Sequence, residues 1–234
     1  MDEICQIADQ ENVDAVIVAG DLFDTINPPI EASELLYKTL KRLANNGQRP
    51  VIAIAGNHDS PDRIEAPDSL ARECGILFVG LPHSTISPIK IDGGFETLRT
   101  DRGFCELKLP NSDTPLRITT TPYANEIRLR TYLGHEESEE ALRNVLREHW
   151  QTTANNYCDD EGVNILTTHL FMVKEGTPLP DEPDDEKPIL YVGGASPIYS
   201  TDIPESIQYV ALGHLHRMQT IDTKPCPVVY TGSP

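Results

Sequence analysis

Four short apolar runs in this chain each end in side chains that can bind a metal ion, and no other feature constrains the fold as strongly. Each run is rich in Val, Ile, Leu or Ala, as are strands that are buried on both faces of a parallel sheet. Open α/β sheets collect functional groups at the carboxyl ends of their strands, so these side chains can meet in space. The four are Val16–Gly20 before Asp21, Ile52–Gly56 before Asn57 and His58, Asn164–Thr168 before His169, and Tyr209–Gly213 before His214 and His216.

The spacing of the first two runs predicts a strand, a helix and a second strand. Leu36, Leu40 and Leu43 form one apolar stripe on a helix expected over 31–46, and Gly47 suits the position that ends it. The two strands should then be parallel, with a right-handed crossover. Further along, the sequence predicts a short helix near 67–74, a partly antiparallel sheet over 83–122, an amphipathic helix over 139–152 and a solvated acidic loop over 178–188.

The charge balance excludes some functions. There are 37 acidic and 19 basic residues, for a net charge of −18, so a basic nucleic-acid-binding module is ruled out. No apolar run approaches the roughly 18 residues of a membrane span, and no secretory signal is visible. The five cysteines are scattered and never in a CxxC pair, which favours reduced thiols in a cytoplasm.

The ligands at the strand ends favour particular metals. One Asp, one Asn and several His without Cys form a mixed oxygen and nitrogen set, which suits Mn²⁺, Fe²⁺ or Zn²⁺ better than Ca²⁺. A carboxylate can bridge two such ions, and an ion pair can neutralise the oxygens of a phosphate ester during hydrolysis. The sequence has no GxxxxGK[ST] phosphate loop, no HExxH helix and no GxSxG turn. The alternative is four polar strand ends that fall together by coincidence.

These segments resemble the motifs of the calcineurin-like metallophosphoesterases, and they occur in that family's order. The matching segments are Gly20-Asp21-Leu22-Phe23-Asp24, Gly56-Asn57-His58-Asp59, Thr168-His169-Leu170 and Gly213-His214-Leu215-His216. More narrowly, 211–217 and the closing 230–234 resemble the SbcD-like nucleases within the family. The resemblance implies an α/β sandwich of mixed β-sheets flanked by helices, with residues 1–234 as one metallophosphoesterase (nuclease) domain.

The resemblance also implies a two-metal site. Asp21 would bridge two divalent ions, with Mn²⁺ the expected metal. Asn57, His169 and His214 would bind the second ion, and His216 would bind the first.

Four further residues receive roles near the reacting phosphate. His58 would stabilise the phosphate in the transition state or protonate the leaving oxygen, with Asp59 as its orienting partner. Asp24 and Arg217 are candidate substrate-side groups. For Asp24, a loop carboxylate that caps a nearby amide is an equal alternative.

One departure from the family pattern concerns the first ion. The first motif of the family, an Asp-x-His that supplies two ligands, does not occur in this sequence. A helical pattern of Ile4, Ile7 and Ala8 is already under way at the first residue. The sequence therefore predicts an inactive fragment, which lacks its first strand and a C-terminal capping domain.

Three functions are compatible with these observations. The first is a DNA nuclease subunit for repair and recombination in the cytoplasm, dimeric within its complex, partnered by an SbcC-like ATPase and without membrane contact. Either the ATPase partner or local arginines would then supply the phosphate contacts, the arginines being Arg63, Arg128, Arg130 and Arg217. The second is hydrolysis of a small phosphate ester or nucleotide, which the net charge favours. The third is a non-catalytic scaffold.

Overall fold

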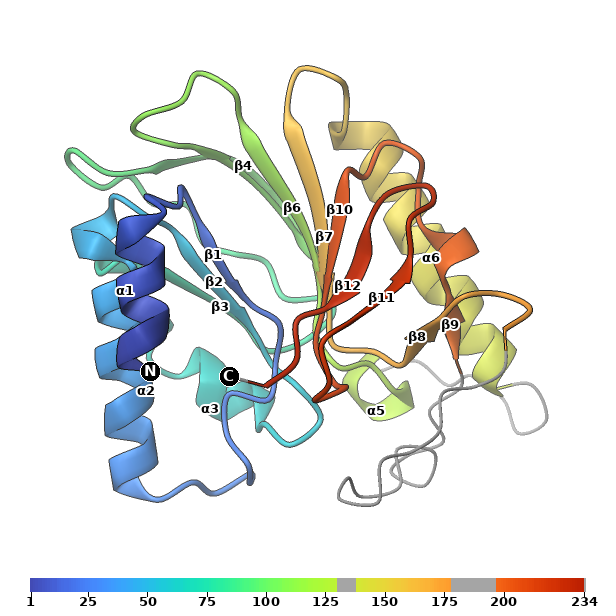
Figure 1. The fold of residues 1–234 in the computed structure, drawn as a ribbon, viewed down its shortest axis with the longest axis horizontal. Helices are drawn as coiled ribbons and strands as arrows, with labels where there is room; N and C mark the ends of the chain where they lie inside the picture. Colours follow the sequence, from blue (N-terminus) through green and yellow to red (C-terminus); the bar gives the residue numbers. More distant parts are fainter. Residues whose placement is uncertain (130–137, 178–196, 234) are drawn as a thin grey trace.

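Two packed β-sheets with helices on both outer faces form this protein, as a computed structural model shows for residues 1–129, 138–177 and 197–233 (Figure 1). Of these two, the smaller sheet has the strand order β1-β2-β3, and the larger has the order β11-β12-β10-β7-β6-β5-β4. A separate two-stranded parallel sheet pairs β8 with β9. The fold class predicted from the sequence, mixed β-sheets flanked by helices, is confirmed.

The elements follow one another closely along the chain. The strands are β1 (Val16–Val18), β2 (Val51–Ile54), β3 (Ile76–Val79), β4 (Glu96–Asp101), β5 (Phe104–Lys108), β6 (Leu116–Thr121), β7 (Val163–Thr168), β8 (Met172–Val173), β9 (Ile198–Tyr199), β10 (Tyr209–Leu212), β11 (Gln219–Asp222) and β12 (Val228–Tyr230). The helices are α1 (Asp2–Gln10), α2 (Ile30–Leu43), α3 (Pro61–Glu65), α4 (Asp68–Glu73), α5 (Glu126–Leu129) and α6 (Ser138–Tyr157), with short 3₁₀ turns η1 (Asn45–Gly47) and η3 (Ser200–Asp202).

The smaller sheet confirms the predicted strand–helix–strand unit. Its strands are parallel, with Val16 opposite Val51 and Val51 opposite Ile76. Strand β1 was expected to be buried on both faces, but its three residues are only half-buried; the other edge strand, β3, is fully buried, because α3 and α4 pack against it. Strand β2 lies at the centre and is fully buried.

Alternation along β2 shows how the layers are held together. Val51 and Ala53 belong to a core shared with α1 and α2, while Ile52 and Ile54 belong to a core shared with the larger sheet. Successive side chains of a strand point to opposite faces, so one apolar run serves two interfaces. Figure 1 shows α1 and α2 on one outer side and α6 on the other.

The larger sheet is antiparallel on one side and parallel in the middle. Strands β4, β5 and β6 are antiparallel, as predicted for the 83–122 region, whereas β6, β7, β10 and β12 run parallel. The carboxyl ends of β7 and β10 therefore lie side by side. Helix α6 covers this sheet, and Trp150 Nε1 on α6 donates a hydrogen bond to Thr121 Oγ1 at 2.8 Å.

The helix boundaries differ from the sequence expectation in three places. Helix α2 ends at Leu43 rather than near 46, because Asn45 and Asn46 adopt left-handed backbone angles that Asn tolerates. Helix α6 continues to Tyr157, and α3 was not predicted. The acidic loop predicted over 178–188 lies outside the described residues. No helix in the described ranges combines the length and the apolar character that crossing a membrane requires.

Candidate metal centre

The predicted ligands from four strand ends meet at one point of the molecule. His169, which follows β7, places Nε2 2.9 Å from Asn57 Oδ1 and 3.2 Å from Asp21 Oδ2. His214, which follows β10, places Nδ1 3.1 Å from the same Asn57 oxygen. The two imidazole rings lie with their centroids 5.3 Å apart. The loops after β1, β2, β7 and β10 thus bring together four side chains that lie far apart in the sequence.

The hydrogen-bonding state of His169 suits a metal ligand. Its Nδ1 lies 2.7 Å from the carbonyl oxygen of Ala19, and a carbonyl can only accept, so Nδ1 carries the proton. In the neutral ring the lone pair is then on Nε2, which faces the oxygens of Asn57 and Asp21. A proton on Nε2, or a metal cation in the place of that proton, would hold these three atoms together. A ligand histidine typically donates its other N–H to a backbone carbonyl, as His169 does.

The spacing of these atoms also fits a shared ion. Metal–ligand bonds of about 2.1 Å at right angles place neighbouring donor atoms about 3.0 Å apart. The contacts that Asn57 Oδ1 makes with His169 Nε2 and His214 Nδ1 are 2.9 and 3.1 Å. Asp21, Asn57, His169 and His214 therefore have the chemistry and the spacing to hold a divalent ion.

The amide oxygen of Asn57 is essential to this set. In residues 1–129, 138–177 and 197–233, no three His, Cys, Asp or Glu side chains form a metal-holding group by themselves. Asn57 Oδ1 contacts both histidines, so it lies at the centre of the cluster. His216, the expected ligand of the first ion, is exposed two residues beyond His214.

Burial and neighbouring groups keep His214 neutral and Asp21 ionised, and these are the forms that bind a cation. Burial lowers the pKa of His214 to about 4, helped by the neighbouring His169, so its ring is neutral at pH 7. His214 also has a φ of +103°, a strained angle for a residue with a side chain. Burial would raise the pKa of Asp21, but His169 and the amide of His58 outweigh it, and this pKa lies below its ordinary value.

Glycines at the strand ends allow the neighbouring loops and the ligand side chains to approach one another closely. A Cβ atom on Gly56 would lie 2.0 Å from Asp21 Oδ1, and one on Gly20 would lie 2.2 Å from His169 Nδ1. On Gly213 it would lie 1.8 Å from the carbonyl oxygen of Ala19. Side chains at these positions would occupy the space of the site itself, so only glycine fits there.

His58 lies beside the ligands and is held through its backbone and its ring. Its amide donates to Asp21 Oδ1 at 3.0 Å, and its Nδ1 lies 3.2 Å from the carbonyl oxygen of Asp24. The carbonyl only accepts, so Nδ1 is the donor in this contact. The contact of Asp24 with this ring is through its backbone, while its carboxylate lies on an exposed residue.

The carboxylate of Asp59, the expected orienting partner of His58, bonds backbone amides; its expected role stays a prediction. Its carboxylate is buried and accepts hydrogen bonds from the amides of Gly56 at 2.8 Å and of Leu22 and Phe23, each at 3.0 Å. The carboxylate therefore ties the loop after β1 to the loop after β2, and it is the Asp24 carbonyl that contacts the His58 ring. Burial raises the pKa of Asp59, an effect that the three amides oppose.

The arginines expected to contact phosphate differ in their contacts and exposure. Arg128 on α5 donates to backbone carbonyls of the loop after β2 instead of facing outward. Arg63 lies 3.4 Å from the Asn27 side chain, and Arg217 is exposed beyond His216. Arg130 lies outside the described residues. No local signal in the sequence indicated the contacts of Arg128, because its partners are about 70 positions away.

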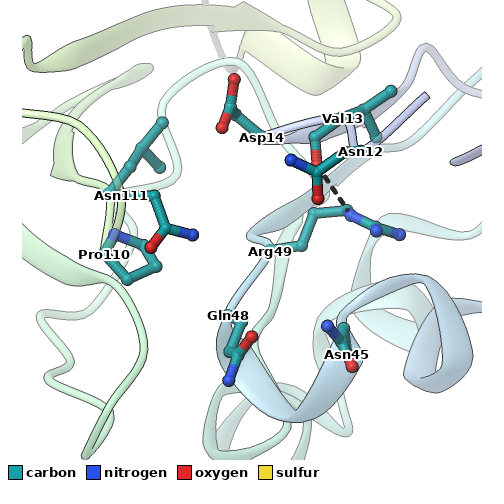
Figure 2. A pocket seen from close by; sticks show the side chains of 9 residues that line it. Asn12, Val13, Asp14, Asn45, Gln48, Arg49, Pro110 and Asn111 are labelled. Carbon is teal, nitrogen blue, oxygen red and sulfur yellow. Dashed lines mark hydrogen bonds between the residues drawn. The ribbon is translucent and has the colours of Figure 1, made fainter. Parts of the chain in front are cut away.

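A small polar hollow lies at the opposite ends of the strands. It is about 40 Å³, enough for roughly three water molecules. Figure 2 shows Arg49 at its wall, where Nε donates to the carbonyl oxygen of Val13 at 2.9 Å. Val13 precedes β1 and Arg49 precedes β2, so the hollow opens at the amino ends of these strands. It has no part in the ligand cluster.

A sandwich of two sheets that gathers oxygen and imidazole ligands at its strand ends is the architecture of a metal-dependent phosphoesterase. The chain belongs to the calcineurin-like phosphoesterase family, whose family model matches residues 1–218. Enzymes of this family use divalent metal ions to hydrolyse phosphoesters.

Two curated relatives carry the same name, that of the SbcD subunit of the nuclease SbcCD. The chain is 35% identical over 238 residues to the relative from Bacillus subtilis (strain 168), a match that covers 100% of this chain and 54% of that protein. It is 32% identical over 227 residues to the relative from Rhodobacter capsulatus, covering 96% of this chain and 53% of that protein. The chain thus spans about half the length of the curated relatives it matches.

Proposed function

We propose that this chain is the metallophosphoesterase part of a nuclease subunit that hydrolyses phosphodiester bonds in DNA. Its partner would be an SbcC-like ATPase, with the subunit as a homodimer in a cytoplasmic complex that serves DNA repair and recombination. The observation that carries the proposal is the 35% identity over the full length of this chain to a nuclease subunit. The meeting of Asp21, Asn57, His169 and His214 at one point supports it.

We assign each site residue a role in this proposal. Asp21 would bridge two divalent ions, Asn57, His169 and His214 would hold the second ion, and His216 would bind the first. The ions, Mn²⁺ in this proposal, would lower the pKa of a water nucleophile and offset charge on the phosphate. His58 Nε2, directed by the contact of Nδ1 with Asp24, would donate to a phosphate oxygen or to the leaving oxygen.

A small phosphate ester or nucleotide is the second candidate substrate. The net charge of −18 favours it, because a duplex-binding surface is usually basic. Arg128 was expected to contact phosphate, but it donates its hydrogen bonds to backbone carbonyls. This also favours a small substrate over DNA. An ATPase partner would supply the missing phosphate contacts if DNA is the substrate.

A substrate comparison tests the proposed function. The complete natural protein, stripped of metal and reloaded with Mn²⁺, Mg²⁺ or Zn²⁺, is assayed with and without its ATPase partner. The substrates are labelled duplex DNA, bis(p-nitrophenyl) phosphate and p-nitrophenyl phosphate. We expect Mn²⁺-dependent cleavage of DNA and of the diester, and little hydrolysis of the monoester. A preference for the monoester would support the second candidate, and hydrolysis of none of them would support a scaffold.

The uneven ligand set predicts how many ions the 234 residues hold. Four side chains are available to the second ion, whereas within residues 1–129, 138–177 and 197–233 this proposal assigns only Asp21 and His216 to the first. We expect about one tightly bound Mn²⁺ per chain and negligible DNA cleavage, because two-metal hydrolysis needs both ions. Equilibrium dialysis with metal analysis, beside an amino-extended chain that carries an Asp-x-His motif, measures this. Two tight ions and full activity in the 234 residues would contradict it.

A further inference from the structure

The loop after β2 is hydrogen-bonded on both of its faces. Its carbonyl groups face α5, where the Arg128 guanidinium donates to Gly56 O at 2.8 Å, Asp59 O at 2.8 Å and Asn57 O at 3.5 Å. Two chain segments about 70 positions apart are thus joined by one side chain. The loop carries both Asn57 and His58.

The amide groups of the same loop face the other way. The Gly56 amide donates to Asp59 Oδ2 at 2.8 Å, and the His58 amide donates to Asp21 Oδ1 at 3.0 Å. The Asn57 carbonyl and the His58 amide belong to one rigid peptide plane, so this plane cannot rotate without breaking the contacts with both Arg128 and Asp21. Arg128 also holds the Gly56 and Asp59 carbonyls on either side of this plane. Together these bonds fix the directions of the Asn57 and His58 side chains.

Arg128 is itself held in place. Its backbone amide donates to Asn125 Oδ1 at 2.9 Å, and its guanidinium carbon lies 5.0 Å from the centre of the Tyr123 ring. The Tyr123 amide in turn donates to the carbonyl oxygen of Ala55 at 2.9 Å. Burial lowers the pKa of Arg128, an effect opposed by Tyr123 and by the charges of Asp59 and Asp21. The guanidinium charge thus faces the two carboxylates across the loop.

We propose that Arg128 is a positioning residue of the metal centre, which acts through the 56–59 backbone on Asn57 and His58 without contacting ion or substrate. A planar guanidinium presents several donors in a fixed fork, which matches carbonyls that converge from successive residues. A lysine would offer one flexible point charge and could satisfy only part of the set. The effect on turnover rests on the proposed function, whereas the effect on metal affinity does not.

The test compares Arg128→Met, Arg128→Lys and the control Arg147→Met. Arg147 is an exposed arginine of α6 that bonds Asn144, so it matches the charge change away from the site. Mn²⁺ affinity of the 234-residue chain is followed by electron paramagnetic resonance, and melting is recorded in parallel. We expect Arg128→Met to weaken Mn²⁺ binding by about 10- to 100-fold, as for other groups that orient ligands. Arg128→Lys should recover part of this, and Arg147→Met should leave it unchanged.

A rescue experiment separates positioning from general stability. Millimolar ethylguanidinium should restore Mn²⁺ affinity to Arg128→Met, and in the complete protein it should restore kcat more than KM. Wild-type Mn²⁺ affinity in Arg128→Met would overturn the proposal. So would a loss of Mn²⁺ affinity in Arg128→Met and Arg128→Lys that parallels their loss of melting temperature and that ethylguanidinium does not restore. If the complete protein cleaves no phosphodiester while Arg128→Met still weakens Mn²⁺ binding, the positioning role stands and the proposed function fails.

Discussion

Replacing His58 with Gln should lower phosphodiester turnover by about 10²-fold or more while leaving the metal content unchanged. A group that acts only on the transition state lowers kcat when it is removed, without releasing the ions that hold the ground state. The geometry supports this separation, because the His58 amide bonds Asp21 and remains in the variant, while the ring faces the Asp24 carbonyl. The measurement is kcat together with metal analysis of the complete natural protein.

His149→Gln is the matched control for this substitution. His149 is a partly buried histidine on α6, away from the ligand cluster, and burial lowers its pKa. The control should keep both turnover and metal content. By contrast, His169→Ala should remove the second ion. A His58 variant that has lost one metal equivalent would show that His58 is a ligand and not a group that acts on the phosphate.

Replacing Gly213 with Ala should abolish tight metal binding and destabilise the fold by about 1–3 kcal/mol or more, as overpacking does. The added Cβ would lie 1.8 Å from the carbonyl oxygen of Ala19 and 2.8 Å from His169 Nδ1. Relief of these clashes must move the loop after β10, which carries His214, or break the bond that orients His169. Thermal melting and Mn²⁺ titration measure the two effects.

A control variant at a second glycine, Gly93, separates the effect of this clash from the general cost of replacing glycine with alanine. Gly93→Ala places its Cβ in open space and has only the strain of a φ of +70°, about 1–2 kcal/mol. It should therefore retain metal binding at a slightly lower melting temperature. Tight Mn²⁺ binding by Gly213→Ala would mean that the loops after β1 and β10 separate more easily than their packing indicates.

Much of the fold was predictable because its signals are local. The apolar runs, the stripe of Leu36, Leu40 and Leu43, and Gly47 each lie within a few residues of the element that they define. The partial burial of β1 was not predictable, because burial depends on which elements pack against a strand. The end of α2 was missed because Asn45 and Asn46 fit a helix by periodicity and leave it only through their backbone angles.

The candidate site was likewise predictable only in part. Asp21, Asn57, His169 and His214 were found because each follows an apolar run, and parallel strands bring their carboxyl ends together. Their metal-binding roles stay predictions, as do those of His58 and His216. The resemblance implied that Asp59 orients His58, whereas in the structure the Asp59 carboxylate bonds the amides of Gly56, Leu22 and Phe23.

The sequence by itself determined the four strands that precede the candidate ligands and which side chains stand at their ends, since both depend on residues that are neighbours in the chain. Only the tertiary structure decided what Asp59 and Arg128 bind. The groups that their side chains hydrogen-bond lie 36 to 72 positions away, apart from the nearby Gly56 amide, and all are backbone groups, which have no residue-specific signature. A buried carboxylate or guanidinium must pair with whichever amides or carbonyls the assembled loops leave unsatisfied, and that choice exists only once the two sheets have packed.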